Sequence, residues 1–121
     1  MHTIVHTEFA ADDPAALAQF YKSIFGWEIT AMGGDYQLWQ AGDTEPRQSG
    51  GIRPFYPDES HGPSRRTVAY ISVADIPATL ERIAAVGGTR MIEKTDIGGG
   101  HGFYACFGDP AGNTVGLWSK E

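Results

Sequence analysis

The sequence predicts an α+β domain built from two similar halves, and three observations predict it. Residues 12–29, DDPAALAQFYKSIFGWEI, and residues 75–90, DIPATLERIAAVGGTR, follow the same plan about half a chain apart. Each segment starts like a capped helix and reaches glycine at its end. Each is preceded by one strand-like run and followed by others. We therefore expect strand, helix and three strands in each half, with the sheets curved around a shared cleft and the helices outside.

The two helices share their start signals. An Asp side chain can accept hydrogen bonds from the free N–H groups of a first turn, and Pro there loses nothing because its missing N–H would be unpaired. The matching positions are Pro14, Ala15 and Leu17 in the first half and Pro77, Ala78 and Leu80 in the second. Both segments are therefore predicted to be helices.

Apolar residues recur at helical spacing in both segments, and such a stripe normally faces the core. The first stripe is Leu17, Phe20, Ile24 and Phe25; the second, thinner one is Leu80, Ile83 and Ala84. Gly26 is predicted to take the left-handed conformation that ends the first helix, and Gly87 with Gly88 to end the second.

Residues 3–10, TIVHTEFA, are predicted to form the first strand. Because side chains alternate along a strand, His6 and Glu8 share one face, and Val5, Thr7 and Phe9 share the other. The second face suits packing on a helix. His6 and Glu8 are therefore expected on the opposite side of the sheet, toward solvent or a cavity.

The remaining strands of the first half are predicted at residues 27–30, 35–41 and 50–56, with a turn at 32–35 and a polar loop at 41–49. Pro54 indicates a sheet edge or the end of its strand. Residues 57–66, PDESHGPSRR, have the composition of a linker. We therefore expect one domain over residues 1–121, with a first module at about 1–56 and a second at about 67–121.

The second half restarts the pattern. Strands are predicted at residues 67–73, 89–92, 103–108 and 114–118, with a glycine-rich turn at 97–102. Residues 109–113, DPAGN, suit a tight turn, because Pro110 pre-sets one φ angle and Gly112 and Asn113 tolerate positive φ.

Composition excludes several classes of partner. The chain has 121 residues and a net charge of -6, and its only basic cluster is Arg65 with Arg66, so nucleic acid is not expected. No run of about 18 apolar residues and no leader pattern appears, which predicts a cytoplasmic protein that does not enter a membrane. The single cysteine, Cys106, lies in FYACF and is predicted to be a buried strand thiol.

The segments HTEF, DDPAALAQFYKSIFGW, YISVADIPATLERIAAVGG and DPAGNTVGLW together resemble the vicinal oxygen chelate superfamily. That family includes glyoxalase I, bleomycin-resistance proteins, fosfomycin-resistance enzymes and extradiol dioxygenases. The resemblance covers nearly the whole chain. It implies two βαβββ modules that form a curved mixed sheet around a cleft, usually in a homodimer.

The metal enzymes of that family hold a divalent ion with one side chain on the first and one on the last strand of each module. His6 matches the first position, but GGIRPFY offers no carboxylate or imidazole, and Gly116 stands where the family has Glu. The first strand of the second module, with Val68 and Tyr70, offers no usual ligand. Since a catalytic site needs about three protein ligands, we expect no metal and no cofactor. His101 is the residue that could complete a non-standard site with His6.

Several residues are candidates for a ligand site. His6 and Glu8 could be a general base with its orienting carboxylate, two polar anchors, or a wall inherited from metal enzymes. Arg53 could bind an acidic group or be an exposed edge-strand charge, and His101 could reach a ligand or be a surface residue without a role. The aromatic candidates for a pocket wall are Trp39, Tyr70, Tyr104 and Trp118.

Three functions remain open. The first is a metal-independent protein that binds a small molecule, such as an antibiotic or metabolite. The second is a lyase or isomerase acting on a small carbonyl compound, with His6 as acid or base and Glu8 orienting it. The third is a regulatory subunit whose cleft is filled by side chains. Metal-dependent glyoxalase or dioxygenase activity is less favoured, because function depends on the site and not on the fold.

Overall fold

A computed structural model describes residues 2–43, 47–55 and 67–121. The predicted linker at 57–66 lies outside the described residues. The chain forms two compact units: the N-terminal unit, residues 6–67, and the C-terminal unit, residues 1–5 with 68–121. Residues 1–5 group with the second half; there, Ser72 N–H donates to the carbonyl oxygen of Thr3 over 2.9 Å.

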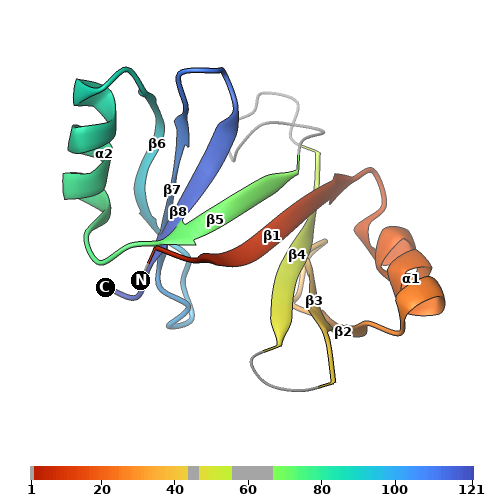
Figure 1. Cartoon of the computed structure of the whole chain (residues 1–121). Helices are drawn as coiled ribbons and strands as arrows, with labels where there is room; N and C mark the ends of the chain where they lie inside the picture. The colour runs from red at the N-terminus through yellow and green to blue at the C-terminus, as the bar shows by residue number, and fades with distance from the viewer. Residues whose placement is uncertain (1, 44–46, 56–66) are drawn as a thin grey trace. The chain divides into compact units, whose positions relative to one another are not determined.

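The N-terminal unit has the predicted order of strand, helix and three strands (Figure 1). Its elements are β1 (Ile4–Ala11), α1 (Pro14–Phe25), β2 (Glu28–Ala31), β3 (Gln37–Ala41) and β4 (Gln48–Pro54). The strands lie in the order β2-β3-β4-β1; β1 and β4 are parallel and the other neighbours antiparallel. Pro54 ends β4, as predicted, but β4 lies between β3 and β1 and is not an edge strand.

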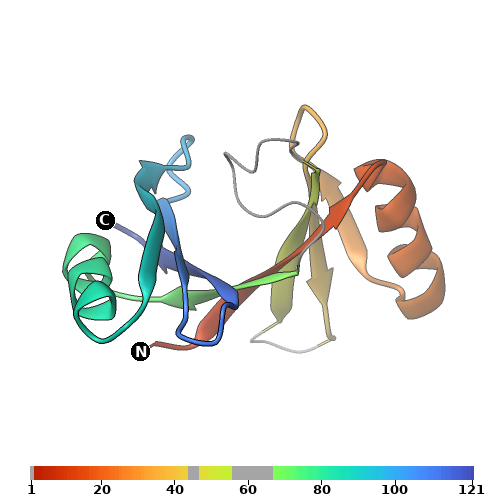
Figure 2. The same ribbon diagram turned by 90° about the horizontal axis from the view of Figure 1, so that it is seen from above.

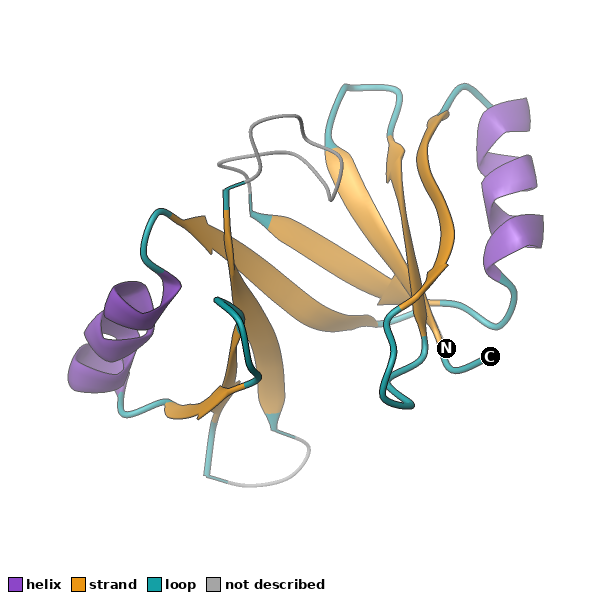
Figure 3. Ribbon diagram, turned by 180° about the vertical axis from the view of Figure 1, so that it is seen from behind, coloured by secondary structure: helices purple, strands orange, loops and turns teal. Residues whose placement is uncertain are grey.

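The C-terminal unit repeats this plan, with its helix packed on its own sheet (Figures 2 and 3). Its elements are β5 (Val68–Ser72), α2 (Ile76–Ala85), β6 (Thr89–Asp96), β7 (Phe103–Gly108) and β8 (Thr114–Ser119). The strand order is β5-β8-β7-β6, with β5 and β8 parallel. β6 is twice as long as predicted and has register shifts against β7. The α+β class and the repeat are confirmed.

Both helices begin at the predicted caps. Asp13 Oδ1 accepts a hydrogen bond from Ala16 N–H over 3.1 Å, and Asp75 Oδ1 accepts one from Ala78 N–H over 2.9 Å. Gly26 ends α1 with a φ of 70°, in the left-handed region as predicted. The carboxylates of these two Asp residues thus set where the helices start.

The buried face of α1 differs from the predicted stripe. Phe20, Ile24 and Phe25 are 55, 60 and 61% exposed, so this part of the prediction was wrong. The face toward the sheet consists of Pro14, Leu17, Ala18 and Tyr21. These four positions have the i, i+3, i+4, i+7 spacing of a helix face, and two of them are small residues that let α1 approach the strands closely.

Each unit has its own core beneath its helix. In the N-terminal unit Ala18, Trp39 and Ile52 are buried together, and Phe9 packs against them as predicted. In the C-terminal unit Leu80 packs with four other buried residues, Val73, Ile76, Ala105 and Leu117. No helix in the described part of the chain is long and apolar enough to cross a membrane.

The DPAGN turn is stabilised partly as predicted. Gly112 has a φ of 90°, but Asn113 does not have positive φ. Instead, the Asn113 side-chain amide donates to Asp109 Oδ2 over 2.9 Å. Cys106 is buried in β7, which confirms its predicted placement.

Candidate functional site

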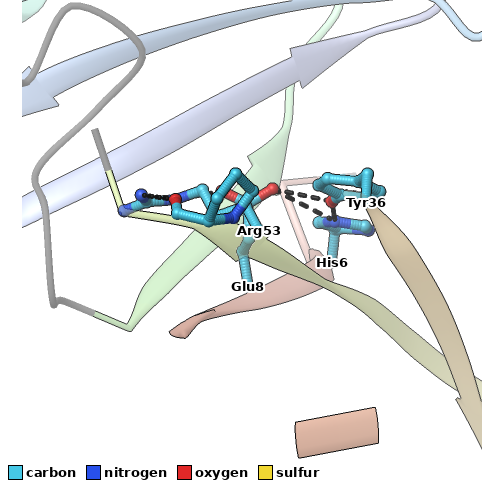
Figure 4. Close-up of polar contacts among 5 residues, drawn as sticks. His6, Glu8, Tyr36 and Arg53 are labelled. Atoms are coloured by element: carbon cyan, nitrogen blue, oxygen red, sulfur yellow. Dashed lines mark hydrogen bonds and ion pairs between the residues drawn. The ribbon is translucent and has the colours of Figure 1, made fainter. Parts of the chain in front are cut away.

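Four polar side chains meet in the N-terminal unit: His6, Glu8, Tyr36 and Arg53, here called the polar quartet (Figure 4). His6 and Glu8 lie on β1 and Arg53 lies on β4. Alternation along each strand turns Phe9 and Ile52 toward α1 and the quartet side chains toward the opposite face. The predicted separation of His6 and Glu8 from the helix side is therefore confirmed.

Tyr36, the fourth member of the quartet, is the residue just before β3. Its ring lies against the backbone of Gly51, where an added Cβ atom would come within 1.9 Å of Tyr36 Oη. Gly51 pairs with Glu8 on one side and with Leu38 on the other. The bare backbone at Gly51 therefore lets the phenol reach across β4 to the side chains of β1.

Hydrogen bonds join the quartet in a row. Tyr36 Oη donates to Glu8 Oε2 over 2.7 Å, and His6 Nε2 lies 2.9 Å from Tyr36 Oη. His6 Nε2 and Glu8 Oε2 are 3.9 Å apart, which is too long for a direct hydrogen bond. Tyr36 is thus the bridge between the two residues predicted to act together.

Glu8 and Arg53 form a buried ion pair. Arg53 Nε lies 2.9 Å from Glu8 Oε1, and the two side chains are 3 and 9% exposed, in that order. Arg53 Nη1 also donates to the carbonyl oxygen of Pro54 over 3.2 Å. The alternative of an exposed edge-strand charge for Arg53 was therefore wrong, because β4 is an inner strand.

Burial lowers the pKa of His6 below its usual value of 6.5, and the nearby Glu8 carboxylate opposes this by favouring the imidazolium. The direction is that of a ring kept neutral around neutral pH. A neutral imidazole can act as a hydrogen-bond acceptor or a base.

Trp39 lies on the other face of this sheet. It is 5% exposed, packs beneath α1 and stacks on Trp27 with ring centroids 4.2 Å apart. A Cβ atom at Gly50 would come within 2.4 Å of the Trp39 ring. Gly50 and Gly51 thus accommodate one aromatic ring on each face, and the quartet does not include Trp39.

The other predicted residues lie in the C-terminal unit. Tyr104 and Trp118 are cross-strand partners on β7 and β8, and the Trp118 indole Nε1–H donates to the His101 carbonyl oxygen over 2.9 Å. Tyr70 pairs with Gly116, and its ring covers that glycine. Strand alternation places Tyr70, Tyr104 and Trp118 on the face opposite α2, whose own face carries Leu117.

The side chains present do not fit a divalent ion held by four ligands, as in the metal enzymes that the sequence resembles. Among the described residues no three His, Cys, Asp or Glu side chains gather at one place. Gly116, which replaces the expected Glu, lies under the Tyr70 ring, and Gly51 lies under the Tyr36 ring. Tyrosine rings fill the space that a side chain on either glycine would need.

The described residues of the N-terminal unit also line a hollow of about 370 Å³ that does not include the quartet. Arg47 forms part of it and is held by Glu28, Gln40 and the carbonyl oxygen of Gly42. Because Glu28 already compensates the charge of Arg47, this hollow attracts an acidic ligand less strongly than its volume suggests.

Tyr36 was predicted only as one of several aromatic residues, and its hydrogen bonds to His6 and Glu8 were not foreseen. It stands outside any regular strand, and its partners are 28 and 30 residues away along the chain. The available signal was the Gly50-Gly51 pair inside a strand, because glycine there often marks the close approach of another group.

A family model and curated relatives both match this chain. The model of the Glyoxalase/Bleomycin resistance protein/Dioxygenase superfamily matches residues 3–117. A Mycobacterium tuberculosis protein named "Putative glyoxylase CFP32" is 31% identical over 114 residues, covering 90% of this chain and 42% of that protein. The "Anthracycline biosynthesis protein DnrV" of Streptomyces peucetius is 30% identical, covering 93 and 45%. The chain thus spans less than half the length of these curated relatives.

Solved structures share the fold at lower identity. The methylmalonyl-CoA epimerase of Streptomyces coelicolor, in complex with 2-nitronate-propionyl-CoA, has a TM-score of 0.73 at 18% identity, with 98% of each chain covered. The Mn(II)-bound glyoxalase of Novosphingobium aromaticivorans has a TM-score of 0.69 at 16% identity, covering 97% of this chain and 38% of that one. These likenesses establish the fold.

Proposed function

Because the chain belongs to the Glyoxalase/Bleomycin resistance protein/Dioxygenase superfamily, we propose that it binds a small organic molecule at the polar quartet without the four-ligand metal ion of the family's metal enzymes. The observation that supports this most is the hydrogen-bonded row from Arg53 through Glu8 and Tyr36 to His6. It places a neutral imidazole and a phenol oxygen on the sheet face opposite α1.

The buried charges have a clear role in this arrangement. An isolated charge is costly to bury, but Glu8 and Arg53 compensate each other and Glu8 also accepts from Tyr36. The ion pair therefore serves as a rigid support. The contacts to a ligand are left to Tyr36 and His6, and the His6 side chain is 26% exposed against 9% for Glu8.

A thermal-shift screen of chelator-treated protein tests the proposal. The panel contains an anthracycline, methylmalonyl-CoA and small aldehydes and ketones, because related proteins carry names in these classes. One class should raise the melting temperature, and His6→Ala should clearly reduce the rise. A ligand at 100 times its Kd stabilises by about 2.7 kcal/mol, which such a screen detects.

His2→Ala is the matched control, because His2 is an exposed histidine outside the quartet. The control should respond to the ligand as the original chain does. Binding that requires added zinc or manganese, or that is equally strong in His6→Ala, would contradict the proposal.

The lowered pKa of His6 favours a second candidate, proton transfer to or from a small carbonyl compound by a lyase or isomerase. The test is exchange of the ligand's C–H hydrogens in deuterated water, followed by proton NMR. Catalysed exchange that disappears in His6→Ala supports an enzyme, and binding without exchange supports a binding protein.

We also propose a homodimer. Phe20, Ile24 and Phe25 form an exposed apolar group on α1, here called the α1 patch. In a two-fold dimer one patch meets its own copy, so apolar surface is matched without complementary charges. Sedimentation of the original chain against a Phe20→Ser, Ile24→Ser variant tests this: a dimer that becomes a monomer supports it, and two monomers contradict it.

A further inference from the structure

The bridge between His6 and Glu8 can be assigned proton by proton. A tyrosine hydroxyl carries one hydrogen and can donate one hydrogen bond. That hydrogen points to Glu8 Oε2, 2.7 Å away. The contact between His6 Nε2 and Tyr36 Oη, at 2.9 Å, therefore needs its hydrogen from the imidazole.

The opposite assignment would require a protonated Glu8. Tyr36 would then donate to His6 Nε2, and Glu8 would donate to Tyr36. The guanidinium of Arg53, with Nε 2.9 Å from Glu8 Oε1, favours the ionised carboxylate instead, because a buried cation is stable only with a charge to meet it. Glu8 therefore accepts from Tyr36 and from Arg53. The hydrogens of the row then have one order: His6 Nε2–H donates to Tyr36 Oη, and Tyr36 Oη–H donates to Glu8 Oε2.

From this order we propose that Tyr36 is a positioning residue that holds His6 as the neutral tautomer protonated at Nε2. The basic nitrogen of the ring is then Nδ1. Arg53 pairs with Glu8, Glu8 accepts a hydrogen bond from Tyr36, and Tyr36 accepts one from His6. These three residues together fix which imidazole nitrogen carries the lone pair.

This assignment, which rests on the proposed function, also specifies a ligand class. Nδ1 accepts a hydrogen bond, so the site favours a molecule that presents an acidic hydrogen: a hydroxyl group or the C–H of an enolisable carbonyl compound. A carboxylate group offers only acceptors and gains nothing from this nitrogen. The matched ligand therefore presents a hydroxyl group or an acidic C–H to Nδ1.

Nitrogen-15 NMR of histidine-labelled, ligand-free protein at about pH 8 tests the tautomer, since protonated and unprotonated ring nitrogens have well separated shifts and an unperturbed imidazole is neutral there. His6 should show a protonated Nε2 and an unprotonated Nδ1. Tyr36→Phe removes the acceptor and should give intermediate shifts from mixed tautomers.

Tyr21→Phe is the control, since Tyr21 stacks on Phe9 on the helix side of the same sheet. It should leave the His6 signals unchanged. A protonated Nδ1 in the original chain, or a Tyr36→Phe spectrum identical to it, would overturn the proposal. The first of these results needs no variant and does not depend on how a variant folds.

Two probes test the ligand class separately. Pentane-2,4-dione has a strongly acidic C–H between its carbonyls, whereas 3,3-dimethylpentane-2,4-dione keeps only the much less acidic C–H bonds of its terminal methyl groups. The first should shift the His6 nitrogen signals and the second should not. Equal shifts, or none with either probe, would overturn the class while the tautomer stands. Failure of the screen alone would count against the proposed function and not against the tautomer.

Discussion

The Tyr36 ring lies directly over the backbone of Gly51, with room for a hydrogen atom and no more. A Cβ atom at Gly51 would be 1.9 Å from the phenol oxygen and 2.3 Å from Cζ. Gly51→Ala should therefore displace the ring and break its bonds to His6 and Glu8. Overpacking of this kind costs about 1–3 kcal/mol, measured by urea denaturation.

Gly50→Ala should destabilise more than Gly51→Ala. Its Cβ atom would meet the backbone oxygen of Thr7 at 1.9 Å and the buried Trp39 ring at 2.4 Å. A strand backbone moves less easily than the end of a tyrosine side chain. The same denaturation series decides the order, and an equal or smaller loss for Gly50→Ala would refute this packing.

Removing one member of the buried ion pair should be costly. Glu8→Leu removes the carboxylate that faces the buried Arg53 guanidinium, which is 3% exposed, and this predicts a loss of about 3–5 kcal/mol. The double variant Glu8→Leu, Arg53→Leu should recover part of that loss, because the guanidinium that lost its carboxylate is removed as well.

The exposed pair Arg90 and Glu93 provides the control for the ion pair. Glu93→Leu should leave the urea midpoint almost unchanged, since solvent screens exposed pairs. If the double variant is no more stable than Glu8→Leu alone, the loss does not come from breaking the Glu8–Arg53 ion pair.

The lowered pKa of His6 predicts how stability changes with pH. In the unfolded chain His6 gains a proton near its usual pKa of 6.5, whereas the folded chain resists protonation to a lower pH. The unfolded state then binds more protons. The contribution of His6 to stability is therefore fully present above 6.5 and is lost as the pH falls from 6.5 to the folded pKa.

Urea denaturation across that pH range, with His6→Gln as reference, measures this effect. The stability difference between the two chains should shift against the original chain as the pH falls. Glu8→Gln should lower the His6 pKa further in an NMR titration, because it removes the charge that favours the imidazolium. A stability difference that shifts in favour of the original chain as the pH falls, or a higher His6 pKa in Glu8→Gln, would contradict the lowered pKa of His6 and its cause.

Local signals predicted the scaffold well. Asp13 and Asp75 could be identified as caps because the hydrogen bonds of a cap join residues three apart. The faces of β1 could be predicted because alternation is a local rule. Pro14 and Ala18 were not recognised as the buried face of α1, since a small residue signals close helix packing only when the strand opposite is known.

The site was harder to predict than the scaffold. His6 and Glu8 could be paired on one strand, but their contact runs through Tyr36, which lies near them only because β3 and β4 bring it there. Arg53 was interpreted as a possible edge-strand charge because the order of strands in a sheet cannot be inferred from neighbouring residues. The pairing of strands that are distant in the sequence thus determines which polar side chains meet, and composition and spacing did not reveal this.

The central proposal is that the quartet binds a small organic molecule and that no metal ion of the family type is needed. The most direct measurement is calorimetric titration of the compound found in the screen into chelator-treated original chain and into His6→Ala. The chelated original chain should bind the compound, and His6→Ala should bind it at least about tenfold more weakly, a loss of about 1.4 kcal/mol. Equal affinity of the two chains, or binding only after a metal ion is restored, would contradict it.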